Sequence, residues 1–285
     1  MLSTTSAALY QQLTLSRLHL GEIATILAVS LSLAVFAGYY AGRARRRRLR
    51  ERADAIDKVV SETTMNAFLA LVGLLLAFTF ANSLSVSQAI KGAITDEAAA
   101  LGTAFLRADY LAEPGRTALQ TALLDYARTR VVPRGTPVDT PEKAQAFLDR
   151  TLTAQARLWP LTLEGTRDPT PPPIQAFVAG AVNGALDAHL YRMATFSVPV
   201  SVFTQAMVLA ASVTAVFLVG DRMGMLGHAL TWRAFLFAFL LGLIMYTIVD
   251  IRRSSEGLIR VDDSALRATI FDMEHALAAR LQARN

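Results

Sequence analysis

Residues 23–42 carry no charged side chain, and a block of arginines follows them at once. About 20 helical residues, at 1.5 Å each, cross the hydrocarbon core of a bilayer. A cleaved signal peptide carries its positive charge before the apolar segment, so the reversed order here indicates a membrane anchor. The arginines that we expect to fix the topology and to contact anionic lipid are Arg43, Arg45, Arg46, Arg47, Arg48, Arg50 and Arg52.

Three further segments have the composition of membrane spans. Residues 63–90 and 193–220 are uncharged, and a shorter uncharged run covers 234–249. The sequence therefore predicts an all-α membrane protein with four transmembrane helices. The predicted order is an N-terminal segment at 1–20, a first span at 21–41, a basic loop at 42–63, a second span at 64–87, a helical extramembrane domain at 88–194, a third span at 195–219, a short loop at 220–229, a fourth span at 230–250, and a C-terminal extended segment and helix at 251–285.

Charge near the spans predicts their orientation. An even number of spans puts both termini on one side. The basic residues of 43–58, with Arg222 and Arg233, outnumber those on the opposite side of the membrane. Because positive loops stay in the cytoplasm, we expect the loop between the first two spans inside, and the central domain and both termini outside.

The sequence of the central segment, residues 88–194, predicts helical stalks. Apolar residues recur at helical spacing from Ile90 to Ala112, and no proline occurs before Pro114. One helix is therefore predicted from about Thr64 to Leu111. A second stripe, from Ile174 to His189, is expected to run without a break into the third span. The second and third spans thus extend into a stalk-and-cap domain outside the membrane.

Four stretches, taken in order, resemble one family. They are GLLLAFTF at 73–80, DEAAALGTAFLRAD at 96–109, the set Asn183, Asp187, Arg192 and Pro199, and DIRR at 250–253 with GLIRV at 257–261. This pattern resembles the bestrophin-like domain family of largely uncharacterised bacterial membrane proteins, which is remotely similar to the bestrophin anion channels.

The resemblance implies a four-span subunit in a bacterial inner membrane. The charge pattern near the spans, and not the resemblance, predicts that the central domain lies in the periplasm. The resemblance also implies a homo-oligomer, a pentamer in bestrophins, whose second span lines a chloride-conducting pore. Bestrophins keep their termini and helical extension in the cytoplasm, whereas the arginine loop of this chain indicates the opposite orientation.

One face of the second span mixes aromatic, hydroxyl and amide groups, as a pore lining does. The candidates are Leu75, Phe78, Thr79, Asn82, Ser85 and Val86. Packing between helices is the alternative, because serine, threonine and asparagine also form hydrogen bonds across helix interfaces.

Antiparallel stalks would bring a second set of polar residues to similar height above the membrane. This extramembrane polar cluster comprises Asp96, Glu97, Asn183 and Asp187, with Arg192 nearer the membrane. One interpretation is that these residues form salt bridges between solvated stalks. Rings around an axis are another, in which the acids would favour cations and Lys91 or Arg192 would favour anions.

Signatures of other functions are weak. The chain has no cysteine, and its four histidines lack metal-ligand spacing, so we expect no metal, no cofactor and no enzyme activity. The positive charge lies beside a span, which argues against nucleic-acid binding. No span interior carries an ionisable residue of the kind that ion-coupled transporters use. We therefore expect a passive channel for inorganic ions, or alternatively a non-conducting scaffold or sensor whose extramembrane domain binds a partner.

Overall fold

The computed structural model describes residues 19–51, 62–131, 141–167, 169–196, 202–252 and 262–284. Within these ranges the regular elements are helices, and no strand occurs. The prediction of an all-α chain is therefore confirmed. Predictions for Arg52, for most of the N-terminal segment and for the extended segment at 257–261 fall outside the described residues.

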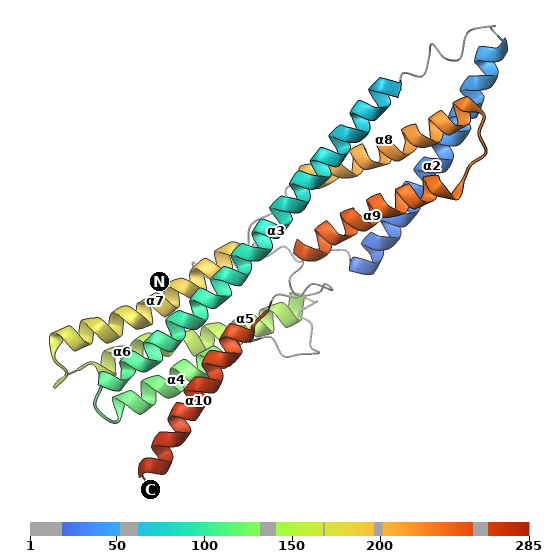
Figure 1. Ribbon diagram of the computed structural model, residues 1–285. Helices are drawn as coiled ribbons and strands as arrows, with labels where there is room; N and C mark the ends of the chain where they lie inside the picture. The colour runs from blue at the N-terminus through green and yellow to red at the C-terminus, as the bar shows by residue number, and fades with distance from the viewer. Residues whose placement is uncertain are drawn as a thin grey trace.

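Four helices are long and apolar enough to cross a membrane: α2 (Leu20–Glu51), α3 (Glu62–Arg107), α8 (Val202–Leu226) and α9 (Trp232–Arg252). They lie together at one end of the molecule (Figure 1). Apolar side chains such as Leu31, Leu76 and Val216 fill the space between them. The four predicted spans therefore form one bundle, in which α9 packs against both α2 and α3.

Helix α3 joins this bundle to a second group of helices. It runs through 46 residues without a break and ends in a short 3₁₀ turn, Ala108–Tyr110. At 1.5 Å per residue it is about 69 Å long. The continuous helix predicted for this segment is confirmed, because no proline or cap interrupts its hydrogen-bond ladder before Pro114.

The second group packs around the far half of α3 (Figure 1). It consists of α4 (Gly115–Thr129), α5 (Pro141–Ala156), α6 (Leu158–Gly165), α7 (Pro172–Phe196) and α10 (Ser264–Arg284). Its core includes Leu101, Leu119 and Val178, all fully buried. Helix α7 packs against α3, and α10 packs against α3 and α4. We refer to this group as the extramembrane domain.

Helices α2 and α8 approach so closely that their backbones touch. Two glycine pairs make this possible, Gly38 and Gly42 on α2 and Gly220 and Gly224 on α8. A Cβ atom on Gly42 would lie 2.0 Å from the carbonyl oxygen of Asp221, and one on Gly220 would lie 2.4 Å from that of Val35. Glycines four residues apart are typical of close contacts between membrane helices. At the arginine-rich end, Arg45 Nη1 adds an ion pair with Asp221 at 3.1 Å.

Two element boundaries differ from the sequence prediction. Helix α2 continues through the arginine block to Glu51, because arginine is a good helix former and cations are favourable at a helix C-terminus. Helix α8 continues to Leu226 instead of ending at 219, since its contact with α2 extends that far. The stripe that begins at Ile174 forms α7, which is described as far as Phe196, and α8 is described from Val202. The predicted continuity between the two falls on residues outside the described ranges.

Candidate functional site

One face of α3 remains exposed along the length of the helix. Its residues, which we call the exposed stripe, are Leu71, Leu74, Phe78, Asn82, Ser85, Ala89, Gly92, Asp96, Ala99 and Thr103. They recur every three or four positions, so they lie on one side of the helix. The opposite side, with Leu76 and Ser83, packs into the core. The other helices thus leave one side of the predicted pore helix uncovered.

The predicted pore-lining residues divide between this stripe and its edge. Phe78 is 66 % exposed, and Asn82 and Ser85 are also exposed. Leu75, Thr79 and Val86 are half-buried beside the stripe. The hydroxyl of Thr79 donates a hydrogen bond to the carbonyl of Leu75 at 2.7 Å, so it is satisfied within its own helix. Phe78, Asn82 and Ser85 are therefore the members of the set that are available to an axis.

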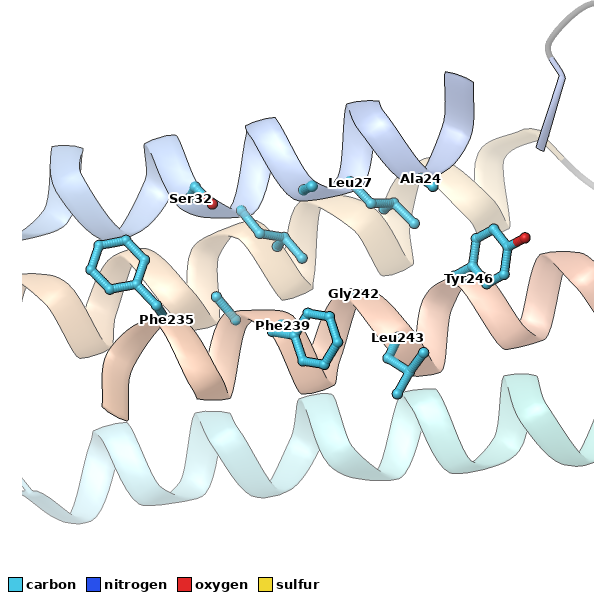
Figure 2. A pocket seen from close by; sticks show the side chains of 11 residues that line it. Ala24, Leu27, Ser32, Phe235, Phe239, Gly242, Leu243 and Tyr246 are labelled. Atoms are coloured by element: carbon cyan, nitrogen blue, oxygen red, sulfur yellow. The ribbon is translucent and has the colours of Figure 1, made fainter. Parts of the chain in front are cut away.

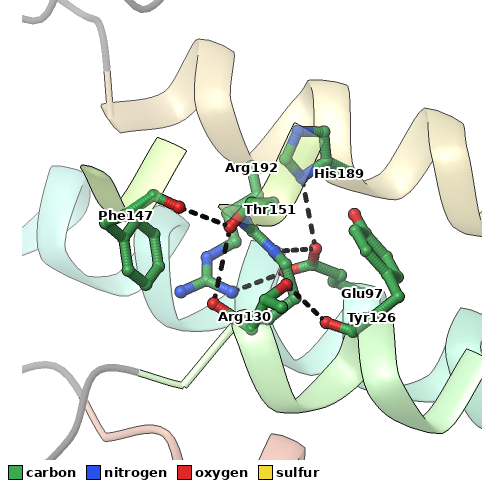
Figure 3. A network of polar contacts seen from close by, with 8 residues as sticks. Glu97, Tyr126, Arg130, Phe147, Thr151, His189 and Arg192 are labelled. Atoms are coloured by element: carbon green, nitrogen blue, oxygen red, sulfur yellow. Dashed lines mark hydrogen bonds and ion pairs between the residues drawn. The ribbon is translucent and has the colours of Figure 1, made fainter. Parts of the chain in front are cut away.

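A buried charge cluster lies in the extramembrane domain, centred on Glu97 of α3 (Figure 3). Glu97 Oε1 accepts a hydrogen bond from Arg130 Nε at 2.7 Å, and Glu97 Oε2 accepts one from Arg192 Nη1 at 2.6 Å. His189 Nδ1 lies 3.5 Å from Oε1. Arg130 follows α4, while His189 and Arg192 belong to α7. One carboxylate therefore ties three helices together.

The cluster keeps its charges despite burial. Glu97 is 0 % exposed, and Arg130 and His189 are 1 % exposed. Burial alone would raise the pKa of the Glu97 carboxyl. The Arg130 charge, the contact with His189 and the Arg192 charge together hold that pKa well below its ordinary range. Burial lowers the pKa of the His189 imidazole, a shift that its contact with Glu97 only partly opposes. The arrangement at pH 7 is therefore a carboxylate, two guanidiniums and a neutral imidazole.

The structure brings together only part of the predicted polar cluster. Glu97 and Arg192 meet, whereas Asp96, Asn183 and Asp187 are exposed. The Asn183 amide donates a hydrogen bond to Asp187 at 3.1 Å on the outer side of α7.

Sequence reasoning missed two members of the buried cluster, Arg130 and His189. A signal existed for both, because each falls on the apolar side of its helix, Arg130 with Leu119 and Tyr126 and His189 with Ala185. A charged or polar residue within an apolar stripe is typical of a buried pair.

A groove of about 280 Å³ lies between α2 and α9 within the four-helix bundle. Its lining is almost entirely apolar, with Leu27, Phe235 and Phe239 among the side chains that face it (Figure 2). Its polar side chains are the hydroxyls of Ser32 and Tyr246, and it is lined by no carboxylate, imidazole, ammonium or guanidinium, so it offers no chemistry comparable to that of the two features above.

Comparison with known proteins places these features in a family. The family model of the bestrophin-like domain matches residues 26–266, which include most of α2, the other three apolar helices and the Glu97 cluster. No curated protein and no solved structure matches the chain. The chain is therefore a membrane protein that belongs to the bestrophin-like domain family.

Proposed function

We propose that this protein forms a homo-oligomer, a pentamer by its family resemblance, in a bacterial inner membrane and passively conducts inorganic ions, without enzyme activity. The exposed stripe of α3 faces the oligomer axis in this proposal. The arginine-rich end of α2 lies in the cytoplasm, and the extramembrane domain lies in the periplasm, as the positive-inside rule indicates.

The exposure of Asn82 is the observation that carries the proposal. Asn82 lies on the outward side of α3, within the predicted span, and no described residue forms a hydrogen bond with its side chain. An amide facing hydrocarbon without a partner costs several kcal/mol, roughly 4–8 on a water-to-cyclohexane scale. An aqueous axis or a neighbouring subunit would remove that cost. The adjacent hydroxyl of Ser85 on the same stripe favours the same environment.

The apolar part of the stripe suits a constriction. Leu71, Leu74 and Phe78 are 52 %, 53 % and 66 % exposed and lie one turn apart, on the arginine-rich side of Asn82. Hydrophobic rings in a pore can gate conduction by excluding water. The predicted pore thus has a narrow apolar section followed by a polar section toward the extramembrane domain.

Current measurement tests the proposal. Purified protein in planar bilayers should conduct, and Phe78→Ala should raise the unitary current because it widens the apolar section. Asn82→Leu should lower the current because it removes a polar group from the pathway. Val72→Ala, on the buried side of the same helix, is the matched control and should leave unitary current unchanged. A correctly assembled oligomer that is electrically silent would refute the channel.

A scaffold or sensor is the second candidate, favoured by apolar exposure far from the membrane. Leu106 and Tyr110 are each 63 % exposed at the distal end of α3, and Phe177 of α7 contacts Tyr110 edge to face at 5.5 Å. Exposed aromatic groups of this kind are typical of protein interfaces. An oligomer axis plugged by large side chains, together with partner binding that Tyr110→Ala weakens, would favour this alternative.

A further inference from the structure

The charge on the exposed stripe differs from the charge of the segment as a whole. Between Phe78 and Thr103, α3 carries three charged residues, Lys91, Asp96 and Glu97. If this stripe lines a pore, the charged side chains that face the pore influence a passing ion most. The side of α3 on which each of the three residues lies therefore decides the sign of the electrostatic field in the pore.

Two of these charges are removed from the stripe. Glu97 is fully buried and compensated by two arginines, so it does not face the axis. Lys91 precedes Asp96 by five residues, which is 500° of helix rotation or about 140° around α3. Its ammonium group therefore starts from a different side of the helix.

Asp96 alone remains on the stripe. It follows Phe78 by 18 residues, which is five full turns, so it stands in line with Phe78 and about 27 Å farther along α3. Asp96 is exposed and forms no ion pair with another residue that the structure describes. Each subunit thus contributes an uncompensated carboxylate to the entrance above the apolar section.

Helix α7 adds no exposed opposing charge at this level. His189 of α7 contacts Glu97, so Asp187 of α7 lies within about one turn of Asp96 in height. Asp187 is exposed, whereas the cation of this part of α7, Arg192, is buried on Glu97. Near this height the exposed charged side chains of α3 and α7 are therefore Asp96, Asp187 on the outer side of α7, and Lys91, about 7.5 Å from Asp96 along α3.

Beyond Asp96, toward the C-terminal end of α3, the next cation is Arg107, which is distant and held in place. The guanidinium of Arg107 lies 4.0 Å from the centre of the Phe177 ring and donates a hydrogen bond to the Phe177 carbonyl at 3.2 Å. Eleven residues separate it from Asp96, about 16 Å along the helix. That distance exceeds the Debye length of roughly 8 Å at physiological ionic strength, so salt screens the two charges from each other.

We infer that the pore is selective for cations over anions through Asp96, an inference that rests on the proposed channel function. It differs from the chloride conduction that the family resemblance implies. An acid about 7 Å from an ion in water-like surroundings concentrates a cation roughly threefold and depletes an anion by about the same factor, and the acids of several subunits act together.

Reversal potentials in a potassium chloride gradient test the inference. We expect the wild-type protein in planar bilayers to prefer K⁺ over Cl⁻. Asp96→Asn should lower the K⁺/Cl⁻ permeability ratio by at least about threefold, and Asp96→Lys should bring it below one. Lys91→Gln is the matched control and should leave the ratio unchanged, because Lys91 lies off the stripe.

The outcomes separate this inference from the channel itself. A conducting protein that prefers Cl⁻, or a ratio that Asp96→Asn does not change, overturns the cation assignment and leaves the channel standing. A larger effect of Lys91→Gln than of Asp96→Asn overturns the placement of the stripe on the axis. An assembled oligomer without current in any salt overturns both proposals. Gel filtration of each variant verifies assembly, which substitution of the exposed Asp96 should not alter.

Discussion

Replacing Glu97 with glutamine should strongly destabilise the extramembrane domain, because it removes the one carboxylate shared by Arg130 and Arg192. The side chain is 0 % exposed, and its two oxygens accept hydrogen bonds from these arginines at 2.7 and 2.6 Å. Removing one partner of a buried ion pair costs about 3–5 kcal/mol, since the remaining charges stay desolvated. For a chain of this size each kcal/mol shifts Tm by about 2–4 °C, so a fall of roughly 10 °C is expected.

Thermal melting in detergent measures this effect. Trp159 on α6 is 40 % exposed and reports on the extramembrane domain through its fluorescence. Asp96→Asn is the matched control, adjacent in sequence but exposed, and should change stability by no more than about 0.5 kcal/mol. Combining Glu97→Gln with Arg192→Gln should recover part of the loss, because it removes one of the two remaining buried charges. A Glu97→Gln protein that melts within about 2 °C of wild type would show that the cluster does not hold the three helices together.

Three further predictions concern packing, pH and topology. Gly220→Ala should lower Tm because its Cβ would meet a carbonyl oxygen of α2 at 2.4 Å, whereas Gly180→Ala, with nothing within 4 Å of its Cβ, should raise stability by about 0.5–1 kcal/mol; equal Tm values would contradict the close contact. His189 binds a proton in the unfolded chain near pH 6.5 but resists it when folded, so stability should be greatest above that pH and fall between pH 7.5 and 5.5 by up to about 1.4 kcal/mol per pH unit. Melting curves of His189→Gln should show a smaller fall, and an undiminished one would exclude this histidine as the cause. The chain lacks cysteine, so Ala146→Cys on α5 should react with an impermeant thiol reagent in intact cells and Ala44→Cys should not; reversed labelling would overturn the proposed orientation.

The sequence was sufficient to predict the long elements of the fold. The spans follow from uncharged runs, and the length of α3 follows from the absence of a break before Pro114. The contact between α2 and α8 was not predicted. Its two glycine pairs are visible in the sequence, but their spacing alone does not identify which helices they join.

The charge cluster shows how much of a site can be predicted from helical spacing alone. Counting residues from the membrane placed Glu97 level with Asp187 and put Arg192 nearer the membrane, whereas the side chains that meet are those of Glu97 and Arg192. Counting residues gives the height along the helix but not the direction in which a side chain faces. It cannot distinguish Glu97 from Asp96, because consecutive residues differ by 100° of rotation, which here places one side chain in the core and the other in solvent. Arg130 could not be placed in this way, since it reaches the cluster through the turn at Pro114, whose geometry depends on tertiary packing.

The unbroken course of α3 couples the two ends of the molecule mechanically. A hinge would need a proline, a bulge or an inserted water in the hydrogen-bond ladder, and α3 has neither a proline nor a break in its helical assignment. A tilt of about 5° applied to a rod about 69 Å long displaces one end by about 6 Å relative to the other. A force applied to the distal helices therefore tilts α3 as a rigid rod and displaces its other end, the stretch of α3 within the bilayer.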